Sequence, residues 1–221
     1  MLTRRLFALG ALAGAASLAG CMSTPTARPL GYQPVPALEP TGSEPFAVAP
    51  TDINAIPIPY RRQLSRAPAG YAPGTIVVDT TNRFLYLVGD DGTAIRYGIG
   101  VGREGMAWSG SATIKRKAKW PTWTPPAEMI ARQPEVAKYA GGMPGGPDNP
   151  LGARALYLYE GNRDTLFRLH GTSQESSIGR AVSSGCIRLM NEDIIDLYQR
   201  VPTGTEVVVL QNRRARTEAV T

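Results

Sequence analysis

Cysteine and histidine are both scarce in this chain of 221 residues, which has two cysteines, Cys21 and Cys186, and a single histidine, His170. Two cysteines exclude a disulfide-rich scaffold. One histidine leaves very few candidates for a zinc site of the Cys/His type, so we expect no metal site. A cysteine that acts as a nucleophile needs a base, and His170 is the only imidazole that could serve.

Acidic residues are fewer than basic ones, 18 against 24, which gives a formal net charge of +6. The basic residues gather in short clusters, and such clusters usually form solvated faces or tails. A basic surface would also suit an anionic polymer of the cell envelope or phospholipid headgroups. No nucleic-acid-binding motif accompanies the charge, so we expect no nucleic-acid partner.

The sequence lacks an apolar run long enough for a comfortable membrane span. Its start, MLTRRLFALGALAGAASLAGC (1–21), has a basic beginning and a shorter apolar run, which is typical of a secretory signal. LAGC (18–21) resembles the bacterial lipobox, in which the cysteine carries the lipid and becomes the mature N-terminus. An ordinary signal with a coincidental cysteine is the alternative. The pair of arginines in TRR (3–5) also fits a twin-arginine signal, so the export route stays open.

We therefore expect an exported, periplasmic protein that is anchored to a membrane by a lipid on Cys21. The outer membrane is favoured, because Met22 is not the aspartate that retains lipoproteins in the inner membrane.

Residues 22–73 lack a sustained apolar period and hold 11 of the 19 prolines. Such a segment has little to bury, and the pattern predicts a disordered, semi-rigid tether. The composition changes near residue 74, where runs rich in β-branched and aromatic residues begin, so we expect one folded domain over residues 74–211. A basic, disordered tail is predicted over residues 212–221.

The folded part contains many short runs rich in β-branched and aromatic residues. TIVVD (75–79) and RFLYLV (83–88) are typical of a β-hairpin, and further strands are expected at residues 93–102, 111–118, 154–159, 165–171 and 205–210. NEDIIDLYQRV (191–201) predicts a helix capped by Asn191. Residues 125–150 predict a long loop with two short helical turns, as in binding loops and lids. The predicted fold class is mainly β.

Cys186 lies in RAVSSGCIRL (180–189), a segment that by itself permits several interpretations. A lipid on Cys21 would remove the partner needed for a disulfide. An inert buried thiol and a nucleophile both remain, because cysteine is among the most buried residue types. Gly185 lets backbone N–H groups approach a substrate carbonyl, and His170 stands at a strand end. A thiol beside an imidazole is a nucleophile for acyl transfer.

HGTSQESSIGRAVSSGCIRLMNEDIIDLY (170–198) resembles the signature of the L,D-transpeptidase catalytic domain family, of the YkuD-like or ErfK/YbiS type. The matching features are HGT, a spacer with Ile-Gly, then Ser-x-Gly-Cys-Ile-Arg-Leu and a helix. NPLG (149–152) followed by RALYLY is similar to the same family, and so is the opening IVVDTTNRFLYLV. The similarity covers about residues 74–210, and it implies a β-sandwich of mixed sheets with one or two helices.

The resemblance implies a cysteine acyltransferase that acts on peptidoglycan. Cys186 would be the nucleophile and His170 its base, with the backbone carbonyl of Gly171 orienting the imidazole. Cys186 would attack the diaminopimelate carbonyl of a donor tetrapeptide stem and expel the terminal D-Ala. The side-chain amine of a second stem would then resolve the thioester into a 3→3 cross-link. No metal and no organic cofactor are implied.

Other positions of the motif line the implied site. Ser183, Gly185 and Arg188 match such positions, and the N–H groups at Gly185 and Cys186 would hold the oxyanion. Arg188 would bind or orient an anionic group of the stem peptide, with a structural ion pair as the alternative. Thr172 would shape the same pocket. Many relatives have a histidine where Ser184 stands, which leaves His170 as the base.

Trp120 and Trp123 are the preferred residues for lining a sugar-peptide groove, although tryptophans in such a segment often belong to the core instead. The expected partners are peptidoglycan stem peptides, with an outer-membrane protein as a possible acceptor, and the protein is expected to be a monomer. Three other outcomes stay open: an L,D-carboxypeptidase, attachment of an outer-membrane protein to peptidoglycan, and a catalytically silent wall-binding module.

Overall fold

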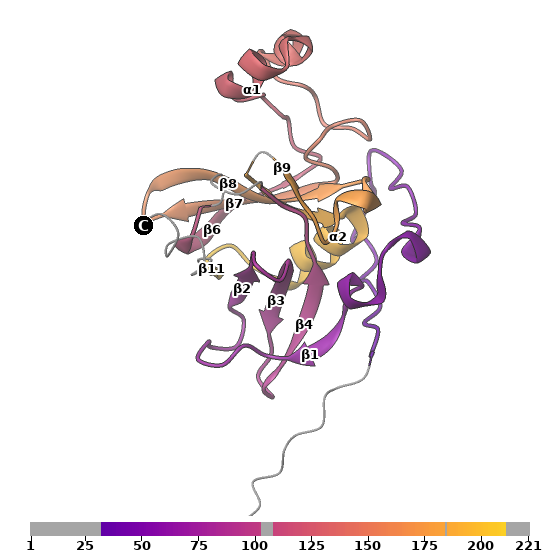
Figure 1. Cartoon of the computed structure of the whole chain (residues 1–221), viewed down its shortest axis with the longest axis vertical. Helices are drawn as coiled ribbons and strands as arrows, with labels where there is room; N and C mark the ends of the chain where they lie inside the picture. The colour runs from indigo at the N-terminus through magenta and orange to yellow at the C-terminus, as the bar shows by residue number, and fades with distance from the viewer. Residues whose placement is uncertain (1–31, 103–107, 184, 211–221) are drawn as a thin grey trace, which may run out of the picture.

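The computed structural model describes residues 32–102, 108–183 and 185–210 (Figure 1). The predicted signal with Cys21 and the predicted tail at 212–221 lie outside these residues. No helix in the described ranges is long and apolar enough to cross a membrane.

Nine strands form one mixed sheet. Their order across the sheet is β1 (Gln63–Arg66), β4 (Thr93–Gly98), β3 (Phe84–Val88), β2 (Ile76–Asp79), β11 (Glu206–Leu210), β6 (Gly110–Lys119), β7 (Arg154–Glu160), β8 (Arg163–Thr172) and β10 (Ile187–Met190). Two short strands, β5 (Val101–Gly102) and β9 (Ala181–Ser183), pair separately. The helices are α1 (Ala127–Arg132) and α2 (Asn191–Arg200), with 3-10 turns η1 (Ile53–Ala55), η2 (Ile58–Tyr60), η3 (Pro134–Tyr139) and η4 (Glu175–Ser177).

The predicted mainly β class is confirmed, but the two layers expected as separate sheets are parts of one sheet. Strand β11 joins them, because it runs parallel to β2 on one side and antiparallel to β6 on the other. The part with β1 to β4 and the part with β6 to β8 lie as two layers (Figure 1). The architecture is therefore a sandwich made by a single sheet that folds over.

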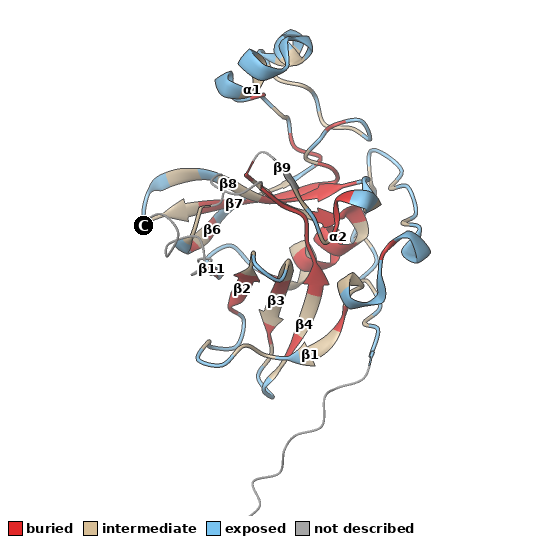
Figure 2. Cartoon of the chain, viewed as in Figure 1, coloured by how far each residue is buried: buried red, intermediate tan, exposed pale blue. Residues whose placement is uncertain are grey.

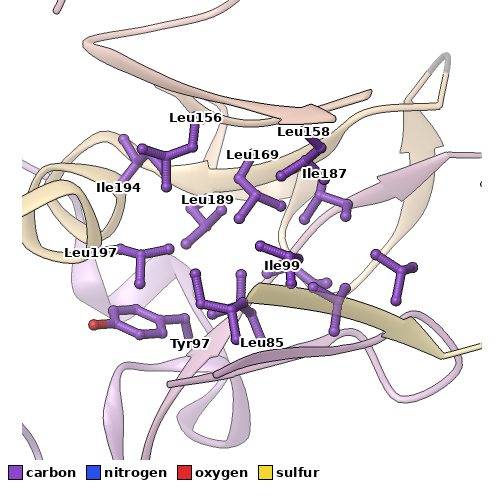
Figure 3. Packing of buried hydrophobic residues seen from close by; sticks show 14 of the residues in the cluster. Leu85, Tyr97, Ile99, Leu156, Leu158, Leu169, Ile187, Leu189, Ile194 and Leu197 are labelled. Carbon is purple, nitrogen blue, oxygen red and sulfur yellow. The ribbon is translucent and has the colours of Figure 1, made fainter. Parts of the chain in front are cut away.

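The core fills the space between these layers (Figure 3). Leu85 and Tyr97 come from one layer, Leu156 and Leu169 from the other, and α2 adds Leu197; all are fully buried. A fully buried side chain of this size contributes about 1.5–3 kcal/mol to stability. In Figure 2 the segments coloured as buried accordingly lie on α2 and on parts of the strands.

The predicted helix begins at Asn191, but this residue does not cap it. Asn191 is the first helical residue, and its Oδ1 accepts a hydrogen bond from the backbone N–H of Ala153 at 2.9 Å. The side chain therefore holds the start of β7 against the helix instead of capping it.

The sequence predicts a disordered tether over 22–73, but its described part is docked on the domain. Residues 32–66, named here the strap, end in β1, which pairs antiparallel with β4 and extends the sheet by one strand. The prolines do allow an extended path, and side chains of α2 bind the strap's backbone. Leu38 N–H donates to Asp196 Oδ1 at 2.8 Å, and Thr51 N–H donates to Glu192 Oε1 at 3.0 Å.

Two ion pairs fasten the strap further. Arg62 pairs with Asp193 at the start of α2, and Glu44 pairs with Arg154 of β7, whose side chain is 1% exposed. Tyr60 packs with Ile178 and Met190, next to the segment that precedes Cys186. The strap is therefore part of the folded unit.

The predicted loop at 125–150 does contain two short helical turns, α1 and η3. They project away from the sheet (Figure 1) and are exposed over most of their length (Figure 2). An isolated bridge between Trp123 and Met143 closes the base of this hairpin.

Candidate active site

Strands β8 and β10 bring Cys186 and His170 to one face at the edge of the sheet. The two strands are parallel, with Ile187 opposite Leu169 and Arg188 opposite His170. Leu169 and Ile187 point into the core, so the alternating residues face the other side. Cys186, one position before Ile187, is thus a diagonal neighbour of His170, and strand spacing and rise put their Cα atoms about 8 Å apart.

The segment before Cys186 is held by close backbone packing. Gly185 has φ 131 and is buried. On one side β5 pairs with β9, and on the other Gly100 exchanges two backbone hydrogen bonds with Arg188, at 2.9 and 2.8 Å. Residues 100–102 therefore contact the chain on both sides of the cysteine.

His170 is 4% exposed, and its Nδ1 lies 2.9 Å from the carbonyl oxygen of Gly171. A carbonyl oxygen can only accept, so Nδ1 carries the hydrogen and Nε2 keeps its lone pair. Burial lowers the pKa of His170 to about 4, against a smaller opposing effect of the hydrogen bond to Gly171, and the charges of Arg188 and Arg168 lower it further. At neutral pH the ring is therefore a neutral base.

Cys186 is half-buried, and burial raises the pKa of its thiol. A backbone hydrogen bond from Arg168 and the charges of Arg168 and Arg188 act in the opposite direction. The resting pair is consequently a neutral thiol beside a neutral imidazole. Proton transfer then has to accompany attack by the sulfur, because a preformed thiolate–imidazolium pair is disfavoured.

Arg188 lies opposite His170 in the register and is half-buried. Its side chain contacts Gln174, with Nη1 3.4 Å from Oε1. None of the carboxylates in the described ranges forms an ion pair with Arg188. The alternative role in a structural ion pair therefore has no carboxylate partner among the described residues.

Arg168 was not among the residues expected from the sequence, although it sits two positions before His170 on the same face of β8. Its guanidinium binds both oxygens of Asp164, at 2.7 and 2.8 Å. It also stacks on the ring of Tyr157, 4.4 Å from the ring centre. The alternation of side chains along a strand could have predicted it, because an arginine two residues before a histidine lies on the same face of the strand.

Thr172 and Ser183 lie near the pair through their strands. Thr172 is buried, and its Oγ1 accepts the backbone N–H of Gln174 at 3.1 Å, so it shapes the turn after β8. Ser183 ends β9, where it pairs with Gly102. Ser184 lies outside the described residues.

Trp120 does not line a groove. It is 8% exposed, its Nε1 donates to Glu44 at 2.7 Å, and its ring meets Phe46 edge-on at 5.1 Å. The strap covers it, which the sequence pattern could not show. Trp123 is half-buried in the projecting hairpin, where it packs against Tyr139. No contact recorded for the described residues joins either tryptophan to Cys186 or His170.

The described residues contain no cluster of three or more His, Cys, Asp or Glu side chains that could hold a metal ion. The chemistry that the described site offers is that of a thiol, a neutral imidazole and two arginines. Such a set can carry out acyl transfer through a thioester.

Comparison with known proteins gives the family. Residues 73–209 match the YkuD family, the L,D-transpeptidase catalytic domain. The probable L,D-transpeptidases YbiS and ErfK/SrfK of Escherichia coli (strain K12) are 37% and 36% identical, over 61% and 62% of this chain. The matches cover 43% and 44% of those proteins, so the chain spans less than half the length of these curated relatives.

Solved structures are similar as well. An L,D-transpeptidase from Mycobacterium smegmatis is 19% identical over 63% of this chain and 59% of its own, with a TM-score of 0.47. A Brucella melitensis protein described as a probable carnitine operon oxidoreductase is 54% identical over 68% of this chain and 94% of its own, with a TM-score of 0.48. The family match spans more than half of the sequence, and the chain belongs to the L,D-transpeptidase catalytic domain (YkuD) family.

Proposed function

We propose that the protein is a peptidoglycan L,D-transpeptidase that works through a thioester on Cys186. The observation that carries the proposal is the parallel pairing of β8 with β10, which sets His170 opposite Arg188 and next to the cysteine. Family membership supports the same chemistry. The donor would be a tetrapeptide stem, and the product a 3→3 cross-link.

The first step forms the thioester. As Sγ of Cys186 attacks the diaminopimelate carbonyl carbon, Nε2 of His170 takes the thiol proton, and the N–H groups of Gly185 and Cys186 bind the oxyanion. The tetrahedral intermediate collapses when the peptide C–N bond breaks. The imidazolium gives its proton to the leaving amine of D-Ala.

The second step transfers the acyl group. The side-chain amine of another stem attacks the thioester carbon, and His170 removes the proton that the nitrogen loses. The C–S bond then breaks, and the sulfur leaves with the bonding electrons and is protonated again from the imidazolium. The Gly171 carbonyl keeps the ring in the tautomer that both steps need.

Arg188 is the proposed binding residue for a stem carboxylate. A guanidinium can bind a carboxylate through two parallel hydrogen bonds, and none of the described carboxylates forms an ion pair with Arg188. A bound carboxylate would hold the donor carbonyl near the sulfur.

The acceptor and the location are also parts of the proposal. Water in place of the amine would make the protein an L,D-carboxypeptidase, and an amine of an outer-membrane protein would attach that protein to the wall. The protein would be exported and held in the periplasm by a lipid on Cys21. A catalytically silent wall-binding module is the contrasting candidate, and the retention of both Cys186 and His170 argues against it.

Intact-mass measurement after incubation with a carbapenem tests the nucleophile without needing an acceptor. The purified chain should gain the mass of one carbapenem, and Cys186→Ala should gain none. Cys21→Ser serves as the control, because it removes the other thiol and should still be acylated. An unmodified wild-type mass would rule out the proposed thioester chemistry. If the adduct does form, analysis of the muropeptide products identifies the acceptor.

A further inference from the structure

Strand β8 contains an insertion next to the cysteine. Tyr157 of β7 pairs with Arg168 of β8, and Tyr159 pairs with Asp164. Two residue steps along β7 therefore correspond to four along β8. Residues 164–168 are named here the β8 bulge. Leu166 at its centre has φ 63, and the residue is 75% exposed.

A branched residue in this left-handed conformation is strained, and it persists only where its surroundings hold it. Asp164 supplies much of that support: its Oδ1 accepts the N–H of Leu166 at 2.8 Å, and both of its oxygens bind Arg168. The hydroxyl of Thr165 donates to the carbonyl of Leu158 at 2.7 Å and accepts the N–H of Phe167 at 3.2 Å. The bulge is thus a fixed loop and not a frayed part of the strand.

The bulge aims the carbonyl oxygen of Leu166 at the nucleophile. This oxygen accepts a hydrogen bond from the thiol of Cys186, with Sγ 3.9 Å away, and acylation of the sulfur removes that donor. The N–H of Leu166 is already bound by Asp164, so the carbonyl is the backbone polar group that Leu166 presents to the site. The Leu166 side chain belongs to a residue that is largely exposed, so it is open to a ligand.

We propose that the β8 bulge is the subsite for the acyl acceptor, and that its ligand is a primary amine at the end of an aliphatic chain. The inference rests on the proposed thioester chemistry. An attacking group must come within about 3–3.5 Å of the thioester carbon, which is bonded to Sγ. A carbonyl oxygen at the distance found here is in hydrogen-bond reach of such a group.

In the second step the amine nitrogen donates one N–H to the carbonyl oxygen of Leu166 and gives up another proton to Nε2 of His170. Its lone pair forms the new C–N bond while the C–S bond breaks. Water can use the same carbonyl, but water has no aliphatic chain. The Leu166 side chain packs against the methylene groups of the amine, and this contact favours aminolysis over hydrolysis.

The test is the ratio of cross-linked dimer to tripeptide made from a tetrapeptide stem, measured by liquid chromatography and mass spectrometry. Both products come from the same thioester, so their ratio is independent of the rate of acylation. Leu166→Gly keeps the backbone conformation, which glycine adopts readily, and removes the side chain. The ratio should fall about fourfold, as expected for the loss of about one methylene contact.

Asp164→Ala removes the acceptor for the Leu166 N–H, and the ratio should fall about tenfold, the value of one hydrogen bond at the upper end of its usual range. Asp164→Asn keeps an oxygen acceptor at the same place and should restore most of the ratio. Arg83→Gly is the matched control, because Arg83 has φ 62 in the turn between β2 and β3, outside the bulge. Its ratio should equal that of the wild type.

A ratio unchanged in Leu166→Gly or in Asp164→Ala overturns the assignment of the bulge, and so does a wild type that forms the thioester but only tripeptide. Failure of the carbapenem to modify the wild type overturns the proposed function and this inference with it. The two failures are therefore distinguishable.

Discussion

A methyl group on Gly102 would lie only 2.7 Å from the Cα atom of Gly185, so β5 and the residue before the proposed nucleophile touch backbone to backbone. Strand β5 is also held against the segment before β9, because the N–H of Val101 donates a hydrogen bond to the carbonyl of Arg180 at 3.0 Å. Strand β5 therefore restricts the position of the backbone that carries Cys186.

Gly102→Ala should move Gly185 and with it Cys186. Misplacement of a reacting atom by about 1 Å can cost about 100-fold in rate, and acylation by a carbapenem should slow by at least about tenfold. Gly141→Ala is the control, because a methyl group there meets nothing within 4 Å. Stopped-flow measurement of both variants checks the prediction, and equal rates would mean that the loop does not depend on β5.

The pH dependence of acylation should lack the inflection near 6.5 that an ordinary histidine gives. Burial lowers the pKa of His170 to about 4, and the base is active only when deprotonated, so the rate should be lost as pH falls through about 4. The rate should also rise above neutral pH, because the raised pKa of Cys186 keeps the thiol protonated there. Rates measured from about pH 3 to about pH 10, which extends about one unit below the lowered pKa of His170 and about one unit above the usual pKa of a thiol, decide between the two profiles.

His170→Ala should slow acylation by about 100-fold to 10,000-fold, the usual contribution of a general base. Intact-mass time courses measure the rate, and thermal unfolding of the variant shows whether the fold is kept. An unchanged rate would require another base for Cys186.

Breaking the contact of the strap with β7 should destabilise the whole domain. Glu44→Gln leaves the charge of Arg154, 1% exposed, without its partner carboxylate, and the free energy of unfolding should fall by about 3 kcal/mol. Arg163→Gln breaks an ion pair whose arginine is 71% exposed and should change stability by less than about 1 kcal/mol. Urea unfolding compares the two. Equal stabilities would show that the strap is not coupled to the sheet.

Local patterns predicted much of the fold because the signals lie close together in the sequence. The hairpin of β2 and β3 and the helix α2 show the periods of their classes, and both form where expected. The strand that carries His170 was expected at residues 165–171 and forms as β8. The strand β10, which precedes α2, was not predicted, because it forms only through its pairing with β8.

The parts that the sequence did not predict depend on contacts between distant residues. Leu38 and Asp196 are 158 positions apart, and composition alone makes the strap appear disordered. Burial of Trp120 depends on the same strap. The strained conformation of Leu166 follows from pairing with β7, and no residue type at that position signals it.

Cys21→Ser should release the protein from membranes if the proposed lipid is its anchor. Fractionation of cells that express each form, with membrane and soluble fractions probed for the protein, measures this. Protein that stays with the membranes after the substitution would disprove lipidation at Cys21, and Cys186→Ser, which leaves the proposed anchor intact, is the matched control.

The docked strap also limits how far the catalytic face could travel from such an anchor. A chain of 52 residues, 22–73, could stretch to about 180 Å at about 3.3–3.6 Å per residue. With residues 32–66 laid onto the sheet, the span left is 22–31, whose contour length is at most about 35 Å. An enzyme held by so short a linker would act only close to the membrane that carries its anchor. Only peptidoglycan strands within that distance of the membrane could then be joined.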